Sequence, residues 1–163
     1  CLKLCSCTYY MLHTRDAKFL IAINPNGAII FVSKCWGGRV SDRHLTVHSG
    51  FMNNLMYGDL VLADRGFDIT DDLALVGARL AIPPFTRGKS QLTQEEVDSA
   101  RALSRVRIHV ERAIGRIKNF KILQMTLPIS LIRTPEADTQ YSTIDKILII
   151  CSALCNLSPN LVS

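Results

Sequence analysis

The chain lacks an apolar run long enough to cross a membrane. Its most apolar stretch, residues 147–157, falls well below the roughly 20 residues that a membrane-spanning helix needs, so we predict a buried terminal helix there and no membrane partner. Nine glycines and six prolines among 163 residues exclude collagen-like and low-complexity chains. Because 48% of the residues are hydrophobic, we expect one packed globular domain.

The amino terminus lacks the features of a leader sequence. Residue 1 is Cys and not Met, which indicates a processed chain or a fragment. Residues 1–20 contain charged side chains among scattered apolar ones, with no apolar block followed by a small-residue cleavage site. We therefore predict no signal peptide.

Cysteine is too sparse and too unevenly placed for a disulfide framework, which favours a reducing compartment. Cys151 and Cys155 lie four residues apart in the apolar terminal run, so we expect both on one helix face as small core residues. A structural zinc site would need four convergent ligands with recognisable pair spacing, and we do not expect one. The six cysteines are Cys1, Cys5, Cys7, Cys35, Cys151 and Cys155.

The pattern of apolar residues predicts strands and helices in a single mixed α/β layer structure. Two β-branched runs flank residues 24–27, whose Asn-Pro-Asn-Gly sequence is typical of a hairpin turn. Ser41 or Asp42 can cap a helix that runs towards Leu55. The predicted strands are residues 19–23, 28–32, 60–63 and 80–82, and the other predicted helices are 69–76, 93–120 and 147–157.

The predicted helix over residues 93–120 concentrates the positive charge of the chain. Between Arg101 and Lys121 there are seven basic residues and one acid, Glu111, so this window carries +7 − 1 = +6. The whole chain carries +5, so all other residues sum to −1. A helix face stabilised by ordinary charge pairs would need acids beside the bases. The imbalance favours binding to nucleic acid.

Two carboxylates stand out by their positions. Glu111 flanks the apolar stripe of the basic helix and either pairs with Arg107 or binds a metal. Asp64 directly follows the buried strand at 60–63 and either binds the turn at Arg65 or binds a metal. Carboxylate oxygens are ligands that Mg²⁺ or Mn²⁺ prefers. Two carboxylates are few for phosphodiester cleavage with two metal ions.

Four motifs follow one another in a specific order between residues 18 and 123. They are WGGRVSD (36–42), GDLVLADRGFDI (58–69), PPFTRGKSQLT (83–93) and RIHVERAIGRIKNFKIL (107–123). Together they resemble the DDE-superfamily endonuclease domain of Harbinger-type transposases and of domesticated nucleases derived from them. The resemblance implies an RNase H-like mixed sheet flanked by helices, in which three carboxylates bind two divalent metal ions and a water or 3′-hydroxyl attacks a DNA phosphodiester.

The same resemblance assigns roles to individual residues. Asp64 matches the second Asp of the triad and Glu111 matches its Glu, as catalytic residues and metal ligands. Asp42 matches an acidic position of the family that helix capping explains equally well. The resemblance further implies DNA as partner, a separate accessory DNA-binding protein, and location in the nucleus or also the cytoplasm. The phosphate-facing candidates are Arg65, Lys89, Arg107, Arg112, Arg116 and Lys118.

The first Asp of the triad has no counterpart in the chain. In the family it lies on an opening strand upstream of the hairpin, and residues 1–17 offer only Asp16, directly before the hairpin, to which we do not transfer the role. We therefore predict that the opening catalytic strand is missing, that the next strand has an exposed edge, and that cleavage is impaired. The alternative is a non-enzymatic protein that keeps the basic helix to bind DNA or a partner.

These expectations divide the chain into three parts. Residues 1–17 form a poorly matching segment, residues 18–123 form the endonuclease-like domain, and residues 124–163 supply a loop and an apolar helix of the same domain.

Overall fold

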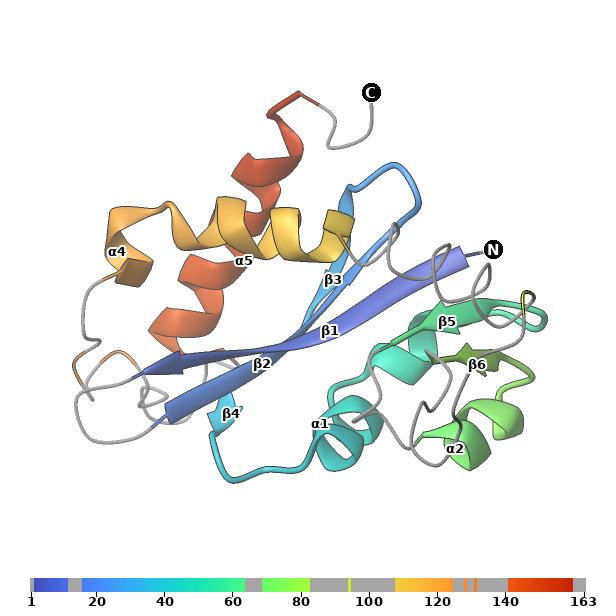
Figure 1. Ribbon diagram of the computed structural model, residues 1–163. Helices are drawn as coiled ribbons and strands as arrows, with labels where there is room; N and C mark the ends of the chain where they lie inside the picture. The colour runs from blue at the N-terminus through green and yellow to red at the C-terminus, as the bar shows by residue number, and fades with distance from the viewer. Residues whose placement is uncertain are drawn as a thin grey trace.

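A mixed β-sheet runs through the centre of the computed structural model, with helices on both of its faces (Figure 1). The structure describes residues 2–11, 16–63, 69–82, 94, 108–124, 128, 131 and 141–159. Within this part of the chain the sheet has six strands in the order β3-β2-β1-β5-β6, and β4 pairs with β2 beside this path. The strands are β1 (Leu2–Met11), β2 (Asp16–Ile23), β3 (Ile29–Val32), β4 (Trp36–Gly37), β5 (Leu60–Leu62) and β6 (Arg79–Ala81).

The first strand corrects the prediction that an opening strand is missing. β1 runs antiparallel to β2, with Leu4 opposite Ile23, and parallel to β5, with Leu4 also opposite Leu62. β2 therefore lies between β1 and β3 and has no exposed edge along this ladder. The prediction failed because it looked for the side chains of a family motif, whereas strand pairing depends on backbone N–H and C=O groups that every non-proline residue carries.

The hairpin between β2 and β3 follows the prediction from its turn sequence. The side-chain oxygen of Asn24 accepts hydrogen bonds from the backbone N–H groups of Asn26 (3.1 Å) and Ala28 (2.9 Å). Gly27 has a φ of 82°, a left-handed conformation that costs glycine little. The turn thus reverses the chain, and the two strands pair antiparallel.

The helix predicted to run towards Leu55 is interrupted in its middle. α1 (Asp42–His48) begins at Ser41, whose Oγ accepts a hydrogen bond from the His44 N–H. Gly50 adopts a φ of 82°, which ends the α-helix, and a short 3₁₀ helix, η1 (Phe51–Asn54), follows. Ser41 is therefore the cap, and Asp42 is the first helical residue.

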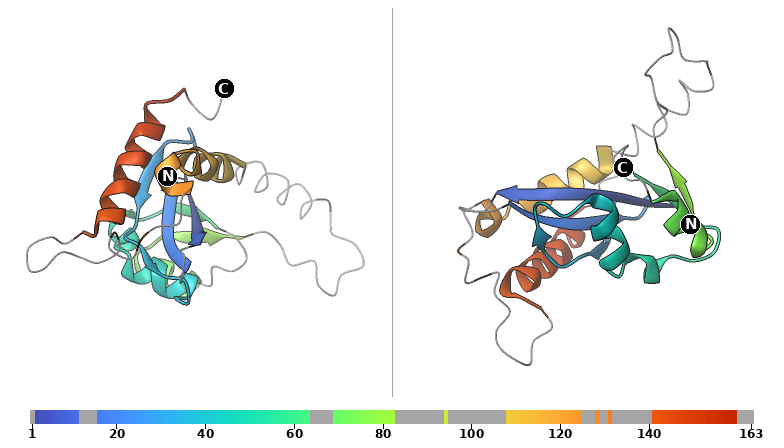
Figure 2. Two further views of the ribbon diagram at one scale, coloured as in Figure 1. Left: turned by 90° about the vertical axis from the view of Figure 1, so that its left-hand side faces the viewer. Right: turned by 90° about the horizontal axis from the view of Figure 1, so that it is seen from below.

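Alternate residues of β2 enter two separate cores, one on each face of the sheet. Phe19, Ile21 and Ile23 face a layer built from the helical residues 108–118, α4 (Lys121–Gln124) and α5 (Thr143–Asn156). Leu20 and Ala22 face α1, η1 and α2 (Thr70–Leu75). This two-residue alternation is what a strand imposes on its side chains, and Figure 2 shows the layers from two further directions.

The strand over residues 60–63 is confirmed as one covered on both faces. Val61 belongs to the core under α1 and α2, and its neighbour Leu62 belongs to the core under α5. The predicted helix at 69–76 and strand at 80–82 are also confirmed, as α2 and β6. Each was recognisable because a short apolar run was bounded by turn residues.

The two helices predicted in the carboxyl-terminal half differ in how far the structure describes them. The terminal helix is confirmed as α5, which buries Cys151 and Cys155 in one core. Of the predicted helix over 93–120, residues 108–118 are helical, and residues 93 and 95–107 lie outside the described part. No helix within the described ranges is long and apolar enough to cross a membrane.

A buried carboxylate fixes the start of α5 against the loop after β3. Asp145 is 5% exposed and accepts hydrogen bonds from the backbone N–H of Ser142 (2.9 Å), from the Ser142 hydroxyl (2.7 Å) and from the backbone N–H of Cys35 (2.7 Å). Ser142 Oγ accepts from the Asp145 N–H in return, which completes a capping box. Burial, with the Asp145 carboxylate as a second cause, raises the pKa of the Cys35 thiol to about 12.

We expect Asp145→Ala to lower the free energy of unfolding by roughly 2–4 kcal/mol, because it leaves buried donors of Ser142 and Cys35 without their acceptor. Denaturant unfolding followed by circular dichroism measures the change. The matched control is Asp71→Ala, which removes an exposed carboxylate from the first turn of α2 and should cost less than about 1 kcal/mol. Equal losses in the two variants would contradict the assigned role of Asp145.

Candidate functional site

The carboxyl end of β5 is the edge of the sheet at which the sequence predicted a site. β5 is parallel to both of its neighbours, and Leu62 pairs with Leu4 of β1 and with Ala81 of β6. Carboxyl ends of parallel strands meet at one edge, where open α/β sheets bind ligands. Asp64 and Arg65 follow β5 in sequence, and both lie outside the described residues, as do Lys89 and Arg107.

The helical residues 108–118 carry the described part of the predicted site. Their buried side chains pack in the same core as Leu62, which lies two residues before Asp64 in the sequence. Glu111, Arg112 and Lys118 are exposed. Outside its own helix, no atom of the described residues lies within 4 Å of a Cβ added at Gly115, one turn beyond Glu111. The buried residues of this helix are Val110, Ala113, Ile114 and Ile117.

Arg116 has an intramolecular contact that its sequence position did not suggest. Its guanidinium donates a hydrogen bond of 2.7 Å to the carbonyl oxygen of Pro159, just beyond α5. The same positive charge lowers the pKa of the Cys155 thiol, but burial and the neighbouring Cys151 outweigh this effect and raise it overall. One of the five N–H donors of the Arg116 guanidinium therefore connects the helical residues 108–118 to the segment that follows α5.

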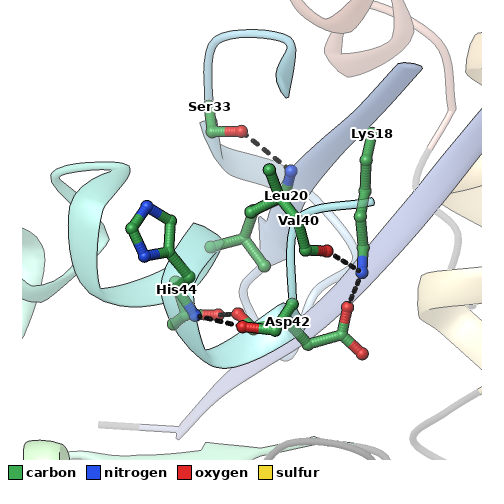
Figure 3. A network of polar contacts seen from close by, with 8 residues as sticks. Lys18, Leu20, Ser33, Val40, Asp42 and His44 are labelled. Carbon is green, nitrogen blue, oxygen red and sulfur yellow. Dashed lines mark hydrogen bonds and ion pairs between the residues drawn. The ribbon is translucent and has the colours of Figure 1, made fainter. Parts of the chain in front are cut away.

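A buried ion pair lies where the Gly-rich motif meets the sheet, and sequence reasoning did not find it. Lys18 of β2 is 1% exposed, and its Nζ donates to the Asp42 carboxylate and, at 3.3 Å, to the carbonyl oxygen of Val40. Figure 3 shows both contacts at the start of α1. A buried ammonium needs a nearby acceptor or counter-charge, and Lys18 finds both in Val40 and Asp42 of the Gly-rich motif.

The only signal in the sequence for this pair was a lysine in an otherwise apolar strand. Lys18 directly precedes FLIAI (19–23), a place where charged residues are rarely buried unless they are paired. The sequence left two roles open for Asp42: the cap of a helix, or the acidic residue that the family has at this position. In the structure Ser41 caps the helix, and Asp42 instead binds Lys18.

The described residues do not by themselves form a metal centre. Within the described ranges no three side chains of the His, Cys, Asp and Glu types come together as a metal site requires. Of the two predicted metal ligands, these ranges include Glu111 and not Asp64.

Comparison with known proteins gives one match. The family model described as DDE superfamily endonuclease matches residues 5–156. This match extends beyond residues 18–123, on which the resemblance of the motifs was based, at both ends. No curated protein and no solved structure matches the chain.

We expect Asp42→Ala to destabilise the fold by roughly 2–4 kcal/mol, because the buried Lys18 ammonium then loses its carboxylate. The loss should be smaller than for a fully buried pair, since the Asp42 side chain is 25% exposed. Lys18→Met keeps the apolar part of the side chain and removes the charge. If the pair acts as described, the double variant Lys18→Met/Asp42→Ala should be more stable than Asp42→Ala alone. Thermal unfolding of the two single variants and the double variant measures this coupling. If the losses of stability in the two single variants simply add up in the double variant, the role of the ion pair is contradicted.

Proposed function

The chain belongs to the DDE superfamily endonuclease family, and from this membership we propose that it is a transposase-derived nuclease domain of the Harbinger type. Its substrate class is DNA, and its reaction is the attack of a water or 3′-hydroxyl on a phosphodiester. The four sequence motifs and the order of the strands support this proposal. An accessory DNA-binding protein and a nuclear location belong to the same proposal.

We infer that the sheet is of the RNase H-like type. The inference is supported by three antiparallel strands, β3-β2-β1, followed by β5 and β6, which run parallel to β1. Helices cover both faces of this sheet. In such an arrangement β1 and the end of β5 lie side by side, so residues of both strands can serve one site.

Asp64 and Glu111 are the proposed metal ligands of that site. Their carboxylate oxygens fit a hard divalent cation such as Mg²⁺ or Mn²⁺. When bound, two such ions stabilise the attacking and leaving oxygens of a phosphodiester. Glu111 projects from a helix that packs on the same face of the sheet as Leu62, and this shared layer supports its pairing with the residue that follows β5.

The observation that carries the proposal of impaired cleavage is the sequence of β1. The strand occupies the central position of the sheet, yet its residues, LKLCSCTYYM, include no Asp or Glu. Asp16 cannot replace the first Asp, because it pairs with Met11. Leu4 is the residue of β1 that pairs with Leu62 of β5, and Met11 lies seven residues further along β1. At the rise of a strand, Leu4 and Met11 are about 23 Å apart. We propose that β1 is the opening strand of the family, and that it lacks the carboxylate of the first Asp of the triad.

The basic helix is the proposed DNA-binding surface. Arg112 and Lys118 are exposed on it and suit phosphate contacts that position a duplex without reading its sequence. Arg116 also serves as an anchor to Pro159. Arg65, Lys89 and Arg107 remain candidates on the strength of the family motifs alone.

A second candidate function is DNA binding without cleavage. Two observations favour this second function: the exposed basic residues Arg112 and Lys118 on the helical residues 108–118, and the absence of Asp and Glu from β1. A binding protein would bind DNA equally well with and without divalent metal, and it would tolerate Asp64→Asn. The nuclease proposal predicts instead that metal strengthens binding and that Asp64→Asn abolishes this gain.

We expect the chain to nick supercoiled plasmid DNA only weakly with Mg²⁺ or Mn²⁺, and the change Ser6→Asp to raise the nicking rate at least about tenfold, which equals about 1.4 kcal/mol of barrier. Ser6 pairs with Ile21, which belongs to the core shared with Leu62 and the helix of Glu111. The gain should disappear in Ser6→Asp/Asp64→Asn and in Ser6→Asp/Glu111→Gln.

The matched control for this gain is Cys7→Asp. Cys7 pairs with Leu20, which belongs to the opposite core, so a carboxylate there should leave the nicking rate unchanged. A Ser6→Asp variant that unfolds cooperatively and stays inactive would contradict the explanation by a missing carboxylate. Nicking by the unaltered chain that survives Asp64→Asn/Glu111→Gln would overturn the assignment of the site itself.

We expect Arg112→Gln/Lys118→Gln to weaken binding to duplex DNA and to reduce the slope of log K against log salt by about 2, or about 1 per lost phosphate contact. Fluorescence anisotropy over a series of salt concentrations measures the slope. The control is Arg79→Gln, which removes an exposed charge from β6 and should leave the slope unchanged. An unchanged slope in the double variant would exclude this face as the DNA-binding surface.

A further inference from the structure

The outer face of α5 carries an apolar stripe that points away from the sheet. On the side that faces the core, Leu148 and Cys151 are 1% and 4% exposed. At about 100° per residue, Ile150 and Leu157 project from the opposite side of the helix, and they are 58% and 82% exposed. Figure 2 shows α5 at the periphery of the molecule, with one side towards the sheet and the other away from it. The stripe consists of Lys146, Ile149, Ile150, Ala153, Leu154 and the cap residue Leu157.

This stripe differs from the outer face of an ordinary surface helix. An amphipathic helix places polar side chains opposite its apolar face, whereas a helix that is apolar all round is normally buried. Asp145 and Lys146 are the only charged residues of α5, and Asp145 is buried in the capping box. Lys146 is therefore the one charge of the stripe, at its amino-terminal end. Such a face suits an apolar protein surface and not a polyanion such as DNA.

The spacing within the stripe is complementary to itself. Its central line is Lys146, Ile150, Ala153 and Leu157, at intervals of four, three and four residues, which is the spacing of a seam between two helices. The distance between packed helices depends on the side chains at their contact, and Ala153 is small enough for a close approach. In an antiparallel pair with a two-fold axis at Ala153, Ile149 of one copy faces Leu157 of the other.

The charge of the stripe favours the same antiparallel arrangement. A two-fold axis at Ala153 separates the two copies of Lys146 by twice seven residues, or about 21 Å along the helices. This is well beyond the Debye length of about 8 Å at physiological ionic strength. Each lysine then approaches the carboxyl end of the other helix, whose last carbonyl groups carry partial negative charge. A parallel pair would instead place the two ammonium groups side by side.

From this geometry we propose that the outer face of α5 is a docking surface for a second copy of this chain, through an antiparallel and two-fold symmetric pair of α5 helices. α5 has 14 residues and is about 21 Å long, so the helix pair alone buries less than the roughly 800 Å² per partner of a standard interface. We therefore expect a reversible dimer. The proposal does not depend on the nuclease activity, because it rests on the side of α5 that faces away from the sheet.

Sedimentation velocity of the full chain over a series of protein concentrations tests the proposal. We expect the unaltered chain to shift from monomer to dimer as the concentration rises. Ile150→Glu places a carboxylate in the helix pair without a partner charge, and it should raise the dissociation constant of the dimer at least about tenfold. The matched control is Leu75→Glu, which introduces the same charge at a leucine of α2 that is 87% exposed, and it should leave the dimer unchanged.

Disulfide cross-linking tests the position of the two-fold axis. Ala153→Cys should form a disulfide between two copies under mild oxidation, because the axis places the two new thiols opposite each other. The disulfide should be absent from Ala153→Cys/Ile150→Glu. The unaltered chain, which has six cysteines of its own, is the control for disulfides that form elsewhere.

Three outcomes would overturn the proposal. The first is a monomer at every concentration, and the second is an equal dissociation constant in the unaltered chain and in Ile150→Glu. The third is binding of a monomeric chain to phosphatidylcholine vesicles that Ile150→Glu abolishes, since the stripe would then contact a lipid surface and not a second copy.

Discussion

The main-chain pairing of β1 on both of its sides is the constraint on which the rest of the fold depends. β1 pairs antiparallel with β2 and parallel with β5, and no other described strand joins the hairpin half of the sheet to the half that holds β5 and β6. Both cores need this continuity, because each contains side chains from β2 together with side chains from β5. The layers on the two faces follow from one continuous sheet.

This constraint separates the architecture of the proposed site from its charge. Backbone hydrogen bonds maintain a strand whatever its side chains are, so β1 is central to the sheet although its residues include no Asp or Glu. Chemistry at a divalent metal ion has no such tolerance, because it depends on how many oxygen ligands converge. Under the proposed function, the chain therefore keeps the sheet, the basic residues and Glu111 of the helical residues 108–118, while its capacity for cleavage is reduced.

Among the described residues, polar contacts in three places attach α1 and α5 to the sheet or to the loop after β3. Lys18 and Asp42 fix the start of α1 against β2, and Asp145 fixes the start of α5 against Cys35. Asn156 fixes the end of α5 against the edge strand β3, since its side chain accepts from the Ile29 N–H and donates to the Ile29 carbonyl, both at 2.8 Å. Apolar packing is not directional, whereas these bonds require specific atoms to meet. They explain how α1 and α5 hold one orientation.

The sequence by itself determined the elements whose signals are local. The Asn24–Gly27 turn, the apolar run that became β5 and the apolar run that became part of α5 each depend on residues close together in the chain. Only the tertiary structure decided which distant residues meet: β1 between β2 and β5, Lys18 with Asp42, Arg116 with Pro159, and Asn156 with Ile29. The physical reason is that a pattern of apolar spacing records burial, whereas pairing between remote segments is set by backbone register and by the satisfaction of buried polar groups.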